Sequence, residues 1–337
     1  AGPGEMMHWI DTDVPGGVIV DAGIRQDLNA NVIDAYSMKG NTVMFDTGKI
    51  LKTGGAAVYG DDNIIQVPAR DNAFVIDLNN VDFGDFPPVT FVGNMAQPRT
   101  MHNSTVLPNG EVLITGGLTG AAVFTDQDAV LGAEIFNETT GWRQVAGMTV
   151  PRTYHSVAIL MVDGRVFVGG GGLCYNTPYC VNHFDAEIYS PHYLFDTNGD
   201  LAQRPTITSI TGNTLGSGPY ANDELVAYGD ILTIDTDIVV EEFSLIRFSA
   251  ATHSTNNEQR RIPLSTVSGT THSLTIPDRN LLPPGYYMLF AIDSNGVPSV
   301  ARTLRIGTAL PLSANSNLVL DMRFELSGGL NLVDFSI

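Results

Sequence analysis

The sequence predicts an all-β protein, with part of a β-propeller at the N-terminal side and an immunoglobulin-like sandwich after it. Three observations support this class. The 337 residues include 35 glycines and 18 prolines, and the sequence has few long stretches with amphipathic periodicity. A hairpin pattern recurs three times along the first 200 residues, and a later region alternates apolar and polar residues. Many short strands joined by tight turns give this combination.

The recurring hairpin has an apolar strand, a turn that contains glycine, a second apolar strand and a Gly-Gly exit. It occupies residues 41–55, 103–117 and 155–170. Glycine supplies the positive φ that such tight turns need. A third apolar strand follows each hairpin, at residues 73–77, 133–136 and 186–189. The period of about 50 to 60 residues is close to that of kelch repeats, which form propeller blades.

Three clear blades, with a partial blade in residues 1–30, are too few to close a ring, because propellers typically use about 4–8 blades. An open part of a propeller exposes apolar blade faces and unpaired strand edges to water. We therefore expect an N-terminal propeller chain or fragment that supplies the remaining blades as a partner.

The repeat stops near residues 201–206, where a proline-containing link begins. Beyond it, residues 231–236, 243–248 and 286–292 alternate apolar and polar side chains with a period of two, as half-buried strands do. About 100 residues of this kind predict an immunoglobulin-like sandwich. The expected division is blades in 1–202, the sandwich in 203–307, and an unassigned tail in 308–337.

The charge balance excludes some classes of function. With 36 acidic and 17 basic residues, the formal net charge is −19. Such a surface repels nucleic acid and anionic membranes, which are bound by clustered Lys and Arg. No apolar run reaches the roughly 18–20 residues of a membrane span. Glycosylation sequons at Asn103 and Asn137 fit a secreted, extracellular protein.

The adjacent residues Tyr154 and His155 lie within a blade signature and are candidate metal ligands. The signature lies in residues 151–174, and further segments follow in a fixed order: 182–190, 251–254, 259–264, 284–290 and 295–301. Together these segments make the chain similar to the galactose oxidase and glyoxal oxidase family of copper-radical oxidases, over roughly residues 1–307. The family has a seven-bladed propeller, so the resemblance implies that this chain begins partway through the fold.

The resemblance implies a Cu2+ site with three ligands in this chain. Tyr154 corresponds to the axial tyrosine, His155 to the neighbouring histidine, and His253 to a histidine on a sandwich loop that reaches the propeller pore. Imidazole and phenolate suit Cu2+. Tyr154 would act as the general base for a primary alcohol or aldehyde, and electrons would pass to O2 to give H2O2.

The resemblance also implies what the chain lacks. The family's radical cofactor is a tyrosine linked to a cysteine, and both correspond to blades upstream of this chain, so that cofactor is not encoded here. Cys174 and Cys180 correspond to a loop pair of the family, which favours a disulfide between them. Two free thiols are the alternative, and a metal clip is disfavoured because no His or Cys partner stands at zinc-site spacing.

The substrate implied by the family is a small alcohol, aldehyde or sugar. Tyr59 and Phe124 correspond to residues of the substrate pocket. Gly60 and Val123 stand where the galactose enzymes have glutamine and proline, so a preference for galactose is not expected.

Alternatives remain at each level. Adjacent side chains on a strand point to opposite faces, so Tyr154 and His155 can converge only at a bulge or an irregular strand entry. Otherwise Tyr154 packs in the pore and His155 binds the backbone. His102 is interpreted as structural. Catalysis itself stays open, since the same fold could serve as a non-catalytic extracellular matrix, wall or filament component.

Overall fold

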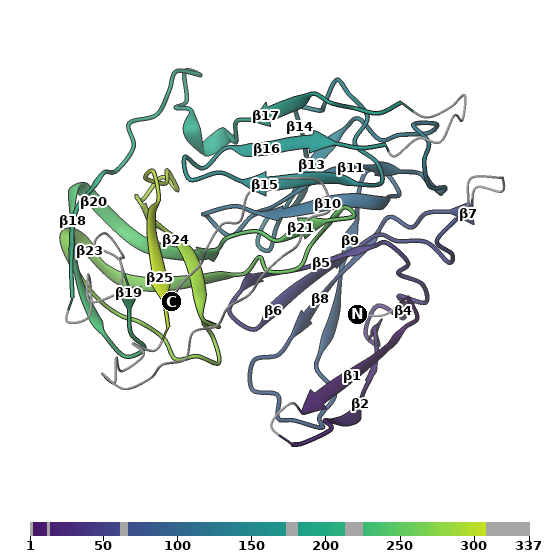
Figure 1. The fold of residues 1–337 in the computed structure, drawn as a ribbon, viewed down its shortest axis with the longest axis horizontal. Coiled ribbons are helices and arrows are strands. Elements are labelled where there is room, and N and C mark those ends of the chain that lie inside the picture. Colours follow the sequence, from purple (N-terminus) through teal and green to yellow (C-terminus); the bar gives the residue numbers. More distant parts are fainter. Residues whose placement is uncertain (1–2, 12–13, 61–66, 173–180, 213–224, 308–337) are drawn as a thin grey trace, which may run out of the picture.

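The computed structural model describes residues 3–11, 14–60, 67–172, 181–212 and 225–307. In these ranges the regular structure is β-strand, apart from one 3-10 turn, η1 (His192–Leu194). Blade sheets fill one side of the molecule, and the strands of the sandwich pack beside them (Figure 1). The prediction of an all-β protein with blades followed by a sandwich is confirmed.

Two blades are antiparallel sheets of four strands. One contains β5 (Asn41–Asp46), β6 (Lys49–Thr53), β8 (Asn72–Asp77) and β9 (Val89–Asn94). The other contains β10 (Thr100–Val106), β11 (Val112–Leu118), β13 (Ala133–Asn137) and β14 (Gly141–Val145). The first three strands of each were predicted from the sequence, whereas β9 and β14 were not.

A third blade sheet has three described strands, β15 (Ser156–Leu160), β16 (Val166–Gly170) and β17 (Ala186–Tyr189). Within the described ranges β17 pairs only with β16, so its outer edge is open where the other two blades carry a fourth strand. The predicted partial blade is a hairpin of β1 (Met6–Asp11) and β2 (Val18–Ile24). Two further short pairs complete this region: β3 (Gln26–Asp27) with β4 (Val32–Ile33), and β7 (Val67–Pro68) with β12 (Gly120–Ala121). A third short pair, β21 (Ala251–Thr252) with β22 (Thr255–Asn256), belongs to the sandwich part of the chain.

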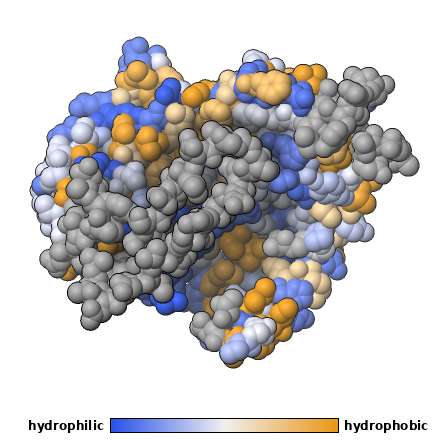
Figure 2. Space-filling view, in the orientation of Figure 1, coloured by the Kyte–Doolittle hydropathy of each residue, from blue (hydrophilic) through white to orange (hydrophobic). Residues whose placement is uncertain are grey.

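The β1–β2 hairpin exposes apolar side chains, with Ile10 at 62% and Ile19 at 69% of their full accessibility. A groove of about 390 Å3 lies between it and the neighbouring blade and is lined by Trp9, Ile50 and Ile76, among others. Figure 2 shows hydrophobic surface around this hairpin and in the hollow beside it. The apolar surface that the sequence predicts for an open propeller is therefore present.

The Gly-Gly exits let neighbouring blades approach each other. Gly54 and Gly116 have positive φ, and a Cβ at either would collide with the backbone oxygen of Arg99 or Arg152 in the next blade. The glycine that follows each donates a hydrogen bond to that same oxygen, at 2.7 Å and 2.8 Å. The repeated glycines are thus required by blade-to-blade contact as well as by turn geometry.

The sandwich is organised by one strand of 17 residues, β20 (Ile231–Arg247). It pairs with β18 (Ile207–Thr211), β23 (Arg261–Thr275) and β24 (Gly285–Ile292), and the sheet continues to β25 (Arg302–Ile306) and β19 (Leu225–Val226). The sequence predicted separate strands at 231–236 and 243–248, which was wrong. The alternation of apolar and polar residues breaks between these two segments. Register shifts between β20 and β23 near Val240 allow β20 to continue through that break as one strand.

Blades and sandwich share a hydrophobic core. Ile246, Met288 and Phe290 of the sandwich belong to the same buried cluster as strands of all three larger blade sheets. The buried side chain of Gln259 accepts a hydrogen bond from Val106 N at 3.0 Å and donates one to Val106 O at 3.3 Å. These contacts fix the sandwich to the blade of β10.

Candidate metal centre

The loop that carries His253 is the tip of the β21–β22 hairpin. His253 and Ser254 have φ of 53° and 60°, as both central residues of a type I′ turn do. Such values are strained for residues other than glycine and need support from their surroundings. Ser254 receives it from the blades: its Oγ donates to Thr153 O at 3.0 Å, and its carbonyl accepts from Asn41 Nδ2 at 3.1 Å. The sandwich hairpin is therefore locked onto the blade sheets.

Tyr154 and His155 lie in the turn that precedes β15, where His155 has φ of 68°. This is the irregular strand entry that two adjacent converging side chains require. Their ring centroids are 3.8 Å apart. His253 stands 4.9 Å from His155 and 5.7 Å from Tyr154 by the same measure. The structure thus brings the three predicted ligands together from two domains.

The hydrogen bonds of the two imidazoles leave one nitrogen of each for a metal. His155 Nδ1 lies 3.2 Å from Gly172 O, and His253 Nδ1 lies 2.6 Å from Thr252 Oγ1. Among the described residues neither Nε2 atom has a hydrogen-bond partner, and the partners on Nδ1 hold the two rings as the partners of metal-binding histidines do. Burial, aided by the neighbouring His253 and Lys39 side chains, lowers the pKa of His155. A neutral imidazole is the form that binds metal.

The set of donors fits copper. Within the described ranges no three of His, Cys, Asp and Glu gather as a metal cluster, so a three-ligand site here needs the Tyr154 oxygen beside two imidazoles. Two nitrogens and one oxygen are donors that Cu2+ accepts. These residues therefore suit the metal in chemistry and in position.

Both predicted pocket residues lie against this group. Tyr59 packs edge-on against Tyr154 with centroids 5.7 Å apart, and Phe124 packs against Tyr154 at 5.4 Å and His155 at 6.0 Å. Burial and a hydrogen bond with Tyr154 raise the pKa of Tyr59, so it stays a neutral phenol. The two aromatic rings form part of the wall of the candidate site.

Lys39 was missed by the sequence analysis. Its Nζ lies 5.3 Å from the ring centroids of both Tyr59 and Tyr154. The signal that could have found it is the blade repeat, since Lys39, Met101 and His155 each precede the turn glycine of their own hairpin by the same interval, with the glycines at 48, 110 and 164. All three have positive φ, of 54°, 58° and 68°.

The remaining site predictions have different outcomes. His102 is fully buried, with Nε2 2.8 Å from Thr53 Oγ1, and burial lowers its pKa to about 3, as for a neutral structural histidine. Asn103 is buried in β10 and donates to Ser156 Oγ at 2.9 Å, so the fold leaves no room for a glycan there. Asn137 ends β13 at the surface and stays a predicted acceptor. Cys174 and Cys180 lie outside the described residues.

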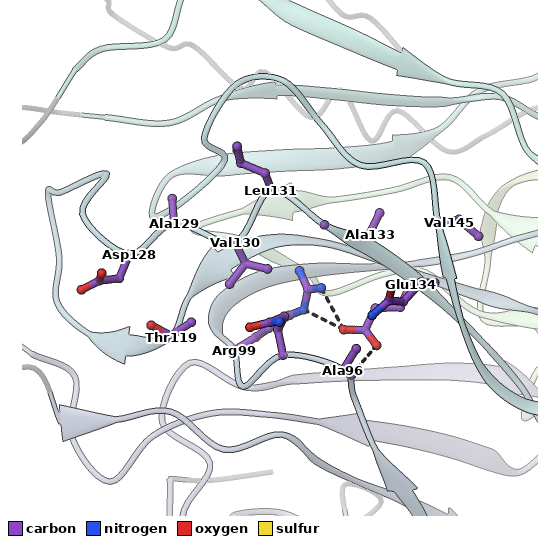
Figure 3. A pocket seen from close by; sticks show the side chains of 13 residues that line it. Ala96, Arg99, Thr119, Asp128, Ala129, Val130, Leu131, Ala133, Glu134 and Val145 are labelled. Carbon is purple, nitrogen blue, oxygen red and sulfur yellow. Dashed lines mark hydrogen bonds and ion pairs between the residues drawn. The ribbon is translucent and has the colours of Figure 1, made fainter.

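A pocket of about 420 Å3 between the loop that precedes β10 and the strands β13 and β14 is separate from this centre (Figure 3). Arg99 and Glu134 line it and form a buried ion pair at 2.8 Å. Glu134 also accepts from Ala96 N, and Arg99 donates to Gly116 O. These bonds already engage both charged groups with the protein, so we assign the pair to blade packing.

No described helix is long and apolar enough to cross a membrane.

Comparison with known proteins identifies the family of the chain. Residues 37–193 match the family model described as glyoxal oxidase N-terminus, and residues 204–306 match the galactose oxidase-like early set domain. A galactose oxidase from Gibberella zeae is 41% identical over 91% of this chain and 43% of its own length. An aldehyde oxidase from Arabidopsis thaliana is 30% identical over 68% of this chain and 39% of its own length.

Among solved structures, a fungal alcohol oxidase of the AA5 family in complex with copper superposes with a TM-score of 0.80 at 35% identity. The match covers 91% of this chain and 60% of that one. The chain thus spans about two fifths of the length of the curated relatives cited above. The fold and these matches show that the chain belongs to the galactose oxidase and glyoxal oxidase family of copper-radical oxidases.

Proposed function

We propose that this chain is the C-terminal part of a secreted copper-radical oxidase that oxidises a primary alcohol or an aldehyde and reduces O2 to H2O2. The observation that carries the proposal is the convergence of Tyr154, His155 and His253 from two domains, with no partner for either Nε2 atom among the residues that the structure describes. The reaction balances: the alcohol, or the hydrate that an aldehyde forms with water, loses two protons and two electrons, and O2 takes up all of them to give H2O2.

Tyr154, His155 and His253 would hold the copper. When bound, the metal would supply the one-electron chemistry that ordinary side chains cannot provide. The chain's own contribution is proton transfer and positioning. The Tyr154 oxygen accepts the substrate hydroxyl proton as a general base. Its hydrogen bond with Tyr59 orients it, and the Phe124 ring restricts the approach of the substrate.

The companion that completes this enzyme would be an N-terminal propeller chain or segment that carries the linked tyrosine and cysteine. The open outer edge of β17 and the exposed apolar side chains of the β1–β2 hairpin support it, because adjoining blades would cover both. Export to the extracellular space is proposed on the family resemblance and on the surface sequon at Asn137.

The experiment is copper analysis and a peroxidase-coupled H2O2 assay on the full-length protein that contains residues 1–337. We expect about one copper per protein and H2O2 production with at least one primary alcohol or aldehyde. Protein that takes up no copper, with no H2O2 from any such substrate, would instead support the non-catalytic matrix, wall or filament component.

A further inference from the structure

Lys39 places a positive charge beside the candidate site. The proposed binding of copper gives this charge no role. Its Nζ is equidistant, at 5.3 Å, from the ring centroids of Tyr59 and Tyr154. The side chain is partly buried. None of the ion pairs in the described part of the chain involves it. A partly desolvated ammonium that no described carboxylate pairs with is costly, and a ligand that brings an anion relieves that cost.

The backbone holds Lys39 in a strained conformation. Its φ of 54° is unfavourable for lysine, yet its carbonyl accepts a hydrogen bond from Met101 N in the next blade at 2.9 Å. The following residue is fixed as well, because a Cβ at Gly40 would lie 2.7 Å from Gly54 O. Strain that the surroundings maintain is a feature of functional sites.

The blade repeat supports the same conclusion. Lys39 occupies in its blade the position that His155 occupies in another, and both side chains lie against Tyr154. Met101, at this position in the blade between them, packs in the same cluster as Tyr154. One blade therefore presents a candidate metal ligand at this position, and another presents a cation.

We propose that Lys39 is a specificity-determining residue that binds the carboxylate of a short hydroxy acid, or of the matching aldehyde acid, whose hydroxyl or aldehyde faces Tyr154. The proposal rests on the proposed oxidase function for the identity of the site. A lysine ammonium is a compact charge with three donors, which suits a carboxylate. On a chain with a net charge of −19, a local cation is also what an anionic substrate needs in order to approach.

The test compares glycolate with its neutral analogue glycolamide, in the full-length protein. Lys39→Met should lower kcat/KM for glycolate by about 10- to 100-fold, the value of a hydrogen bond to a charged group, and change that for glycolamide less than about twofold. Lys39→Arg should keep most of the preference for glycolate. Lys49→Met is the matched control, because Lys49 lies in the same blade but pairs with Glu138 away from the site.

A second readout does not need copper. Glycolate binding to the metal-free protein, followed by calorimetry, should weaken in Lys39→Met and persist in Lys39→Arg and Lys49→Met. If binding depends on Lys39 but no substrate yields H2O2, the anion site stands and the oxidase proposal fails. If glycolate and glycolamide lose activity in parallel, or binding is the same in all variants, Lys39 has only a packing role and the inference is overturned.

Discussion

Ser254 donates its backbone N–H to the carbonyl oxygen of Ser156 at 3.2 Å. Each of these residues directly follows a candidate copper ligand, His253 in the sandwich hairpin and His155 in the blade turn. Together with the bonds of Ser254 to Thr153 and Asn41, this interdomain hydrogen bond sets the spacing of the two histidines. Their geometry depends on how the domains dock, and the predictions below test both the ligands and the docking.

Removal of the sandwich ligand tests the metal site itself. His253→Ala in the full-length protein should weaken copper binding by at least about 100-fold, because it leaves a single nitrogen donor. Copper content after dialysis against a competing chelator measures this. His192→Ala is the control, since His192 is exposed and bonds to Arg143. Equal copper retention in both variants would contradict the assignment.

Thr252 tests the orientation of His253. Thr252→Val keeps the shape of the side chain but removes the hydroxyl 2.6 Å from His253 Nδ1. Loss of such a partner typically costs about 10- to 100-fold in metal affinity. Thr255→Val, on the other strand of the same hairpin, should leave the affinity unchanged. Competition with a calibrated chelator gives both numbers, and indistinguishable affinities would show that Thr252 does not orient the ring.

Docking of the sandwich depends on Gln259. Gln259→Ala leaves the N–H and C=O of Val106 buried without their partner, which should lower the free energy of unfolding by about 1–3 kcal/mol. Gln127→Ala, at an exposed position in a blade loop, is the control and should change it by less than about 0.5 kcal/mol. Denaturant titration of the full-length protein measures the difference. If Gln259→Ala leaves the free energy of unfolding unchanged, water has replaced the amide group.

Stability should fall with acid in part through His102. Burial, together with the nearby charges of Arg99 and Lys52, lowers its pKa from the ordinary 6.5 to about 3. Well above pH 6.5, His102 is unprotonated in both the folded and the unfolded chain. As pH falls towards 3, the unfolded chain gains a proton that the folded chain cannot, and folding weakens.

His102→Gln should therefore flatten the decline in unfolding free energy between pH 7.5 and 5, as measured with denaturant at both values. His8→Gln, at an exposed position of β1, is the control and should leave the slope close to that of the parent. A slope unchanged by His102→Gln would show that His102 is protonated equally in both states.

Residues 1–337 expressed alone should aggregate or melt without cooperativity, because the β1–β2 hairpin and the β17 edge stay uncovered. Co-expression with the N-terminal blades should give a soluble complex. Size-exclusion chromatography and calorimetry distinguish these results. A monodisperse, cooperatively melting monomer would refute the need for a partner.

The blade strands could be predicted because each repeat carries its own turn glycine and its own Gly-Gly exit. The strands β9 and β14 could not, since outer strands face water on one side and lack that pattern. The single long β20 was also missed, because a break in alternation at a bulge has the same sequence signature as a loop.

The candidate ligands were found because Tyr154, His155 and His253 stand in recognisable sequence surroundings. Lys39 has none, and its position follows only when the blades are superposed on their turn glycines. The burial of Asn103 likewise depends on blade packing, which the sequon does not encode. Local sequence thus identified the residues with distinctive chemistry, while the contacts between repeats determined what surrounds them.

The core shared by blades and sandwich ties metal retention to global folding. Ile246 and Met288 bury their side chains in the blade cluster, so the sandwich cannot detach without opening that cluster to water. His253 would leave the centre in the same event. Copper should therefore be released at the melting temperature rather than before it. Loss of the copper absorption band on heating would then report unfolding of the whole molecule, and protein that still holds copper after heating should still be folded.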